Sequence, residues 1–156
     1  MDPKAAKLMP IPPCRDDEYR EVAWATENVG EPFKPVWINR PKVKGHFVKV
    51  DLNYCGICHS DVHLGNNELG GAMFPMVPGH ELVGRVAEVG PDVTTVAVGD
   101  IVGVGVIIDS CLDCHTCNEG EENYCENGRS TMTYNTMKGR YEQFGKKSHF
   151  LGNPET

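Results

Sequence analysis

The chain has 156 residues, which is enough for one domain of ordinary size with a core that needs no disulfides. Lys and Arg number 15 against 22 Asp and Glu, and the formal charge of -7 argues against a broad surface for nucleic acid or anionic membranes. No apolar run reaches the length of about 18 residues that a membrane span needs, and the N-terminus has no signal-peptide core. We therefore expect a cytoplasmic protein that binds neither nucleic acid nor membranes.

The first part of the chain predicts an arm followed by short strands. Residues 1–17 are rich in Pro, Lys and Asp, which predicts a flexible N-terminal arm. Short strands are expected around residues 22–25 and 35–38. The clearest strand is 47–54, where the alternation predicts one shared face for Val48, Val50, Leu52 and Tyr54. A short helix is expected at 60–64, with Ser60 as its N-cap.

The second part of the chain adds two more predicted strands, at 81–89 and 101–107. Turns around Gly90 to Asp92 and around Gly99 to Asp100 separate them. Many short strands joined by Gly and Pro turns favour a mainly β fold, a barrel or distorted sandwich, over a doubly wound parallel sheet.

Four of the seven cysteines stand close together in the pattern CxxCxxCxxxxxxxC. They are Cys111, Cys114, Cys117 and Cys125. Such spacing lets four thiolates converge on one ion, and the filled coordination sphere is typical of structural zinc. An iron–sulfur cluster is the alternative, but in the ferredoxin pattern three residues precede the fourth Cys and Pro follows it. Here seven residues precede that cysteine and Glu126 follows it. Clustered cysteines of this kind suit a reducing compartment better than a disulfide framework.

A second group of possible metal ligands lies in CGICHSDVH, residues 55–63, and PGHE, residues 78–81. Cys58 and His80 could share a zinc ion, and Asp61 or Glu81 could ligate it or orient the histidine. The alternative is a thioredoxin-like redox pair of Cys55 and Cys58. Such a pair belongs to a βαβ setting, whereas the flanking segments here are rich in predicted strands.

Together these motifs resemble the N-terminal half of zinc-dependent medium-chain alcohol dehydrogenases, with the closest fit to their cinnamyl-alcohol-dehydrogenase-like branch. GHE follows 22 residues after Cys58, and the four-cysteine run begins 53 residues after it. The connecting stretches GHELVGRVAEVGPDV, VGDIVGVG and GEENYC followed by TYN also resemble that branch. The resemblance covers roughly residues 20–144 and implies a GroES-like barrel with a zinc-binding lobe at 109–126.

The resemblance also implies roles for individual residues. Cys58 and His80 would be ligands of a catalytic zinc, with Glu81 as an occasional or alternative ligand. Asp61 would hydrogen-bond His80 and fix its tautomer. Ser60 and His63 would relay the alcohol proton to solvent, and His59 would face the pyrophosphate of the cofactor. The expected cofactors are two Zn²⁺ ions and NADP(H), and the expected substrate is a small alcohol or aldehyde, oxidised or reduced by hydride transfer with the zinc as Lewis acid.

Two features of that family have no counterpart in the sequence. Alcohol dehydrogenases hold catalytic zinc with two Cys and one His, and the third ligand of this branch lies well beyond the matching region. No GxGxxG occurs either, because Ile108 stands where the third glycine after Gly103 and Gly105 would be. We therefore expect residues 18–156 to be a GroES-like domain without the Rossmann domain of the family, inactive without it.

The alternative hypothesis is a non-catalytic zinc-binding structural or interaction module derived from the same family. A dimer is expected for the full-length family, and the oligomeric state of this chain stays open.

Overall fold

Antiparallel strands carry most of the fold in the computed structural model, which describes residues 13–128 and 130–135. The strands are β1 (Glu18–Ala25), β2 (Lys34–Pro41), β3 (Val48–Gly56), β4 (Glu81–Val89), β5 (Ile101–Val104), β6 (Ile107–Asp109) and β7 (Thr131–Met132). The helices are α1 (His59–Gly65) and α2 (His115–Asn118), followed by a 3-10 turn at Glu122–Tyr124. The prediction of a mainly β fold is confirmed, and every strand pair of the described residues is antiparallel.

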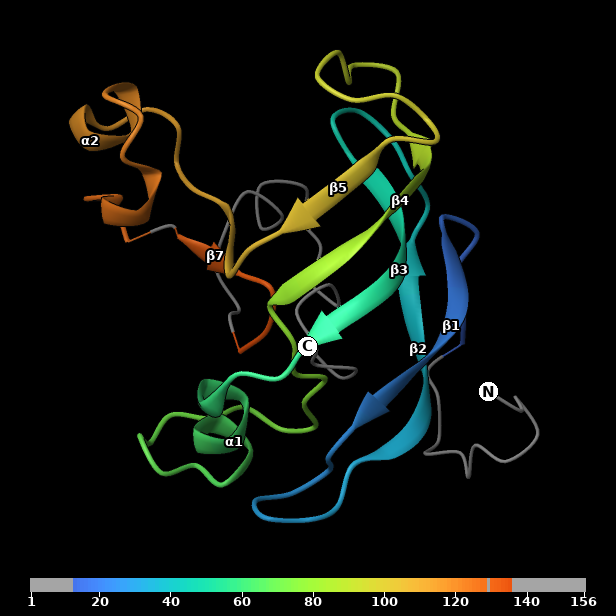
Figure 1. The fold of residues 1–156 in the computed structure, drawn as a ribbon, viewed down its shortest axis with the longest axis vertical. Helices are drawn as coiled ribbons and strands as arrows, with labels where there is room; N and C mark the ends of the chain where they lie inside the picture. Colours follow the sequence, from blue (N-terminus) through green and yellow to red (C-terminus); the bar gives the residue numbers. More distant parts are fainter. Residues whose placement is uncertain (1–12, 129, 136–156) are drawn as a thin grey trace.

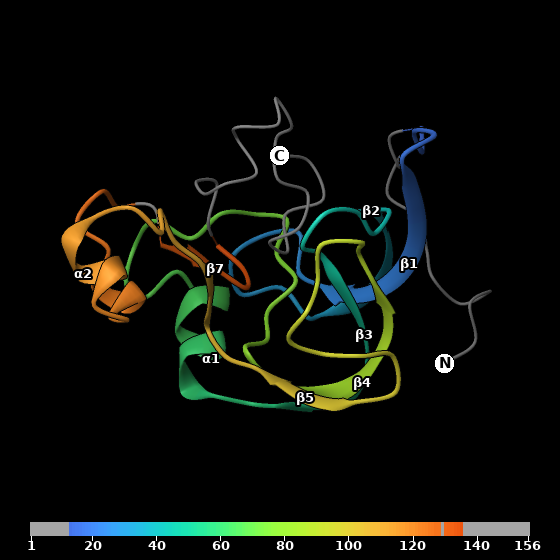
Figure 2. The ribbon, with the colours of Figure 1, turned by 90° about the horizontal axis from the view of Figure 1, so that it is seen from above.

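The strands form three sheets, and the three-stranded sheet lies between the other two (Figure 1). β1 pairs with β2, β4 lies between β3 and β5, and β6 pairs with β7. Figures 1 and 2 place the β1–β2 hairpin on one side of the central sheet and both α1 and α2 on the other. The two cysteine-bearing regions therefore share one side of the molecule.

The buried core lies where the β1–β2 hairpin meets the segment before β4. Ala25, Val36 and Ile38 are buried there, and Ala23 and Val77 pack against them. The segment is joined to the hairpin by backbone hydrogen bonds in both directions between Thr26 and Met76, each 2.9 Å long. This contact fixes the start of the chain stretch that carries His80.

The predicted common face of strand β3 is wrong at its C-terminal end. The register pairs Leu52 with Gly84 and Tyr54 with Val83, so an extra residue of β3 stands between the two pairs. Gly84 and Val83 are neighbours on β4 and point to opposite faces, so Leu52 and Tyr54 do too. Both side chains are exposed, at 52% and 74%. A β-bulge reverses the alternation, and the sequence period alone does not reveal it.

Other element predictions were closer. The strand at 81–89 is confirmed with the same bounds, and the strands around 22–25 and 35–38 are confirmed but longer. The predicted strand 101–107 is wrong as one element. β5 pairs with β4 and ends at Val104, and from Ile107 the chain forms β6, which pairs with β7 instead. The predicted helix 60–64 exists, but its N-cap is Cys58 and not Ser60.

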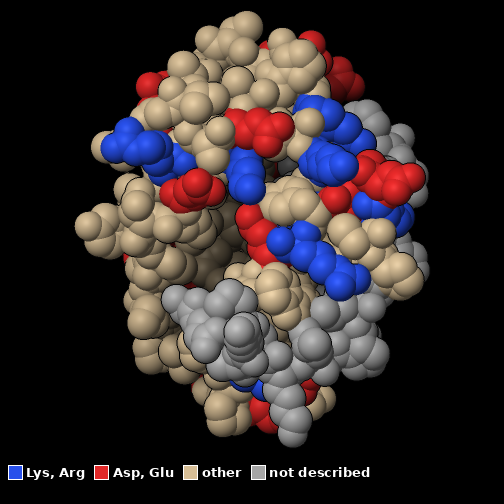
Figure 3. Space-filling view, turned by 90° about the vertical axis from the view of Figure 1, so that its right-hand side faces the viewer, with Lys and Arg blue, Asp and Glu red and all other residues tan. Residues whose placement is uncertain are grey.

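Basic side chains gather around the β1–β2 hairpin. Of the eight Lys and Arg among the described residues, seven lie between Arg15 and Lys49. On the face shown in Figure 3, basic and acidic side chains are interspersed. Among the described residues, ion pairs join Arg15 to Asp17 and Glu18, Lys34 to Glu27, Lys44 to Asp17 and Lys49 to Glu21. The positive charges are thus largely compensated and form no continuous basic patch on this face.

Most of the predicted N-terminal arm, residues 1–12, lies outside the described residues. The part that is described contacts the hairpin. The Asp17 carbonyl accepts a 2.8 Å hydrogen bond from the Lys42 amide, and the Asp16 carbonyl accepts one of 2.7 Å from Lys42 Nζ. Within the described ranges, no helix has the length and apolar character to cross a bilayer.

Candidate functional site

The first candidate metal centre is the cysteine lobe, residues 109–126, which projects from the β6–β7 ladder (Figure 1). β6 enters the lobe and β7 follows it, so the ladder fixes both ends of the loop. The sulfur atoms of its four cysteines all lie within 4.8 Å of one another. They are Cys111, Cys114, Cys117 and Cys125, and all four are free thiols. Four converging sulfurs form the donor set of a closed, structural zinc site.

Hydrogen bonds reach several of the lobe sulfurs, but the pKa values of Cys114 and Cys117 shift in opposite directions. Cys111 Sγ accepts bonds of 3.3 Å from the Cys114 amide and from Asn127 Nδ2. The Thr116 hydroxyl lies 3.3 Å from Cys114 Sγ and, as the largest cause, lowers the pKa of Cys114 to about 5. For Cys117, the bond to Ser110 lowers the pKa, but burial and the neighbouring thiols outweigh it and raise the pKa to about 11. Without a metal, Cys114 therefore loses its proton at a much lower pH than Cys117.

The second candidate centre is the second donor group, Cys58, His80 and Glu81. One donor atom from each lies within 4.8 Å of the others. The β3–β4 register explains the convergence, because it pairs Gly56 with Glu81 and so brings the CGIC turn beside His80. A Cβ at Gly56 would collide with the Glu81 side chain. The glycine of this motif thus leaves room for the carboxylate.

Asp61 ties the two halves of the second donor group together. The residue is buried, with 8% of its surface exposed, and lies at the third position of α1. Oδ2 accepts a 3.0 Å hydrogen bond from the Cys58 amide, while Oδ1 accepts one of 3.1 Å from the Gly79 amide and lies 3.3 Å from His80 Nδ1. This contact holds the proton on Nδ1 and leaves Nε2 of His80 available to a metal ion.

Ser60 lies close to both Cys58 and His80. Its hydroxyl donates to Cys58 Sγ at 3.0 Å and lies 3.4 Å from His80 Nε2. The bond from Ser60 is the main cause that lowers the pKa of Cys58. Burial acts to lower the pKa of His80, but contacts with Cys58 and Asp61 outweigh it and raise the pKa. The arrangement favours a thiolate on Cys58.

The predicted relay residue His63 lies on the exposed side of α1. Its ring is 4.5 Å from that of His59, centroid to centroid, and Nδ1 contacts the Glu68 carboxylate. Glu68 also accepts a 2.9 Å bond from Asn66, and Asn66 first and His63 second lower its pKa. Sequence reasoning missed Glu68. Its only signal was a carboxylate five residues after His63, just past the helix end.

Cys55 does not behave as the partner in a redox pair. Burial, followed by the Asp61 and Glu81 carboxylates, raises its pKa. A redox-active cysteine needs a lowered pKa, which a helix N-terminus can provide. Cys55 is not at such a position, because α1 begins at His59 with Cys58 as its N-cap. The geometry supports the metal interpretation of CGIC over the redox one.

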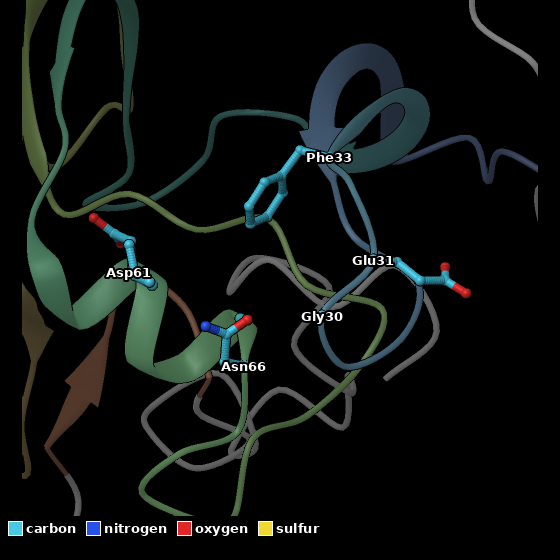
Figure 4. Close-up of a pocket in the computed structure, with 7 residues that line it drawn as sticks. Gly30, Glu31, Phe33, Asp61 and Asn66 are labelled. Atoms are coloured by element: carbon cyan, nitrogen blue, oxygen red, sulfur yellow. The ribbon is translucent and has the colours of Figure 1, made fainter.

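Helix α1 also borders an open pocket of about 110 Å³ that the second donor group does not line. Figure 4 shows it between α1 and the β1–β2 connection, with Phe33 above the helix and the Glu31 side chain turned away. Asp61 contributes from the helix and Asn66 from its C-cap. Because Cys58, His80 and Glu81 are not among its lining residues, this pocket is separate from the point where the donors converge.

Comparison with known proteins identifies the family of the chain. The family model described as "Alcohol dehydrogenase GroES-like domain" matches residues 44–148. The aldehyde reductase YahK of Escherichia coli is 48% identical over 106 residues, which are 68% of this chain and 30% of that protein. Cinnamyl alcohol dehydrogenase 2 of Oryza sativa is 44% identical over 130 residues, covering 82% of this chain and 35% of its own length.

Solved structures show the same likeness. The cinnamyl alcohol dehydrogenase of Helicobacter pylori, solved with NADP(H), matches with a TM-score of 0.78 and 34% identity over 88% of this chain and 38% of its own. A thermostable alcohol dehydrogenase of Pyrobaculum aerophilum, solved with cobalt and zinc, matches with a TM-score of 0.65 and 28% identity, over 79% of this chain and 37% of its own. The chain thus spans about a third of the length of these relatives. It belongs to the alcohol dehydrogenase GroES-like domain family, and within the zinc-dependent alcohol dehydrogenases it corresponds to the N-terminal domain.

Proposed function

We propose that this chain is the zinc-holding domain of an NADP(H)-dependent alcohol dehydrogenase or aldehyde reductase, which exchanges hydride between NADP(H) and a primary alcohol or aldehyde. The observation that carries the proposal is the convergence of Cys58, His80 and Glu81 from two chain segments onto one point. The relatives named cinnamyl alcohol dehydrogenase and aldehyde reductase support the reaction class.

The donor chemistry of this point suits zinc. A thiolate, an imidazole and a carboxylate are its usual ligands, and a fourth position stays open to a substrate. When bound, the ion would supply Lewis-acid polarisation of the oxygen of the alcohol or aldehyde. Asp61 would keep the His80 ring in place through Nδ1. Glu81, in direct strand register with Gly56, would complete the protein ligands.

Two side chains of α1 would handle the proton of the alcohol. Ser60, close to both Cys58 and His80, would receive it at the hydroxyl oxygen. His63 would pass it to solvent from the exposed side of the helix, with its Nδ1 held by Glu68. His59, whose ring neighbours that of His63, would face the pyrophosphate of NADP(H). The helix thus gathers the proposed proton-handling and cofactor-facing groups in one turn and a half.

The cysteine lobe would hold a second zinc with a structural role, so the chain would bind two ions. Residues 18–156 would form one domain, with the lobe at 109–126. The cofactor fold would lie outside it, because the sequence has no GxGxxG and every described ladder is antiparallel.

Metal analysis of the purified chain tests the first part of the proposal. We expect close to two zinc ions per chain, one of them lost in Cys58→Ser. A single ion that survives this substitution would contradict the catalytic site. NADPH titration with cinnamaldehyde tests the second part. We expect no turnover by this chain alone, and measurable turnover would show that the cofactor site is already present.

A second candidate function is a non-catalytic zinc-binding module. The observation that favours it is that the second donor group offers one cysteine, whereas catalytic zinc in alcohol dehydrogenases has two. This candidate predicts one tightly bound zinc, held by the lobe, and no effect of Cys58→Ser on metal content. The same metal analysis therefore separates the two functions.

A further inference from the structure

Tyr134 is a buried residue next to the second donor group. The sequence motifs do not point to Tyr134 as part of that group. It follows β7 in the stretch Thr133-Tyr134-Asn135 and is 3% exposed. Its ring stacks on that of His80, with centroids 5.8 Å apart and an interplanar angle of 25°. An aromatic ring in this position limits the directions in which the imidazole can turn.

The backbone on both sides of Tyr134 is fastened to other segments. The Thr133 amide donates a 2.9 Å bond to the Val106 carbonyl, next to the β6–β7 ladder. Asn135, at a φ of 55°, turns its side chain so that Oδ1 accepts a 2.7 Å bond from the Met73 amide. The ring therefore has little freedom to move away from His80.

The phenol end of Tyr134 faces the residues that orient the donors. Burial and, after it, the Asp61 side chain raise the pKa of Tyr134, whereas Ser60 acts to lower it, so the phenol lies within electrostatic reach of both side chains. Asp61 is the residue that also bonds the Cys58 amide, the Gly79 amide and His80 Nδ1. One side chain thus stacks on the imidazole of a proposed ligand and lies within electrostatic reach of the carboxylate that positions it.

We propose that Tyr134 is a positioning residue of the second metal site, which holds the His80 ring and the Asp61 carboxylate in the orientation that directs His80 Nε2 toward Cys58. The inference rests on the proposed function, because it assigns Tyr134 a role in metal binding at that site. It also gives the TYN stretch, which comes after the cysteine lobe, a place at the other metal centre.

Cobalt binding tests this role. Co²⁺ is titrated into the metal-free chain, and the absorption lost in Cys58→Ser is taken as the signal of the second site. We expect Tyr134→Leu to weaken Co²⁺ binding there by about 10–100-fold, as loss of an orienting partner does, and to shift its absorption bands. Tyr134→Phe keeps the ring and should lose less. The matched control is Tyr54→Phe, at an exposed tyrosine of β3, which should change neither.

If Tyr134 only stabilised the fold, its substitution would lower the thermal stability but would not shift the cobalt absorption bands of a variant that still folds. Unchanged affinity and unchanged bands in both Tyr134 variants would therefore overturn the inference. If Tyr134→Leu does not fold, the Co²⁺ affinity and absorption bands of Tyr134→Phe alone decide whether the inference holds.

Amide hydrogen exchange in the metal-free chain separates this inference from the proposed function. The Cys58 and Gly79 amides both donate to Asp61, so they should exchange faster in Tyr134→Phe than in the parent chain. Unchanged exchange contradicts the positioning role even where no metal binds. If the parent chain shows no Cys58-dependent cobalt signal, the proposed metal site fails, and the role of Tyr134 in metal binding is overturned with it.

Discussion

The cysteine lobe and the second donor group are two candidate metal sites built in opposite ways. All four donors of the lobe come from one stretch, Cys111 to Cys125, closed at its base by a short ladder. The donors of the second group come from a helix N-cap and the start of a strand, 22 residues apart, and converge only through the β3–β4 register. If both sites bind zinc as proposed, the lobe would need its ion in order to fold, whereas the second group would need the fold in order to bind its ion.

Removing a lobe ligand should have the largest effect. Cys114→Ser leaves three thiolates and should release the lobe zinc, because a structural zinc site contributes on the order of 10 kcal/mol to folding of the segment that binds it. We expect metal content to fall from about two ions to about one, and amides of residues 109–126 to lose exchange protection. Cys14→Ser, at an exposed cysteine outside both groups, is the control. Unchanged zinc content in Cys114→Ser would contradict the assignment of a zinc site to the lobe.

Removing a donor of the second group should also release one zinc ion, but it should unfold less of the chain than the loss of a lobe ligand does. In His80→Ala the zinc content should again fall to about one, but the lobe should keep its protection because its four ligands are intact. The β3–β4 ladder and the core at Ala25 and Val36 should hold the fold. Calorimetric unfolding and metal analysis check this together. Loss of both ions would show that the two centres are not independent.

The carboxylate of the second group should matter less than its histidine. Glu81→Gln keeps the shape of the side chain but replaces a charged donor by a neutral amide. We expect zinc affinity at this point to fall on the order of 10–100-fold, with the lobe site unchanged. Competition with a chromophoric chelator measures both affinities in one titration. A Glu81→Gln chain with the affinity of the parent would mean that the carboxylate does not ligate zinc.

The smallest effect concerns the charge of a single lobe thiol without metal. Because its pKa is lowered to about 5, Cys114 is a thiolate above about pH 5 and loses that charge as the pH falls through this value. Iodoacetamide should therefore modify Cys114 at pH 6.5 in the metal-free chain, but not in the zinc-loaded chain. Thr116→Val removes the hydroxyl that lowers the pKa and should slow the reaction at pH 6.5. Peptide mass spectrometry reads the site, and equal rates in both chains would contradict the assigned cause.

The sequence by itself determined the lobe. Its donors are close in the chain, so their spacing was enough to predict the convergence of Cys111, Cys114, Cys117 and Cys125. Strand β4 was predicted with its observed bounds for a similar reason, since turn signals flank it on both sides. Local patterns suffice where the physical interaction is itself local.

Only the tertiary structure decided the rest. The bulge that separates Leu52 from Tyr54, the pairing of Gly56 with Glu81 and the stacking of Tyr134 on His80 depend on partners far along the chain. The same is true of the division of 101–107 into two strands, because β6 pairs with a strand that follows the lobe. A periodicity of two residues fixes which side chains alternate, but the register that brings distant donors together is set by packing and by the turns between the strands.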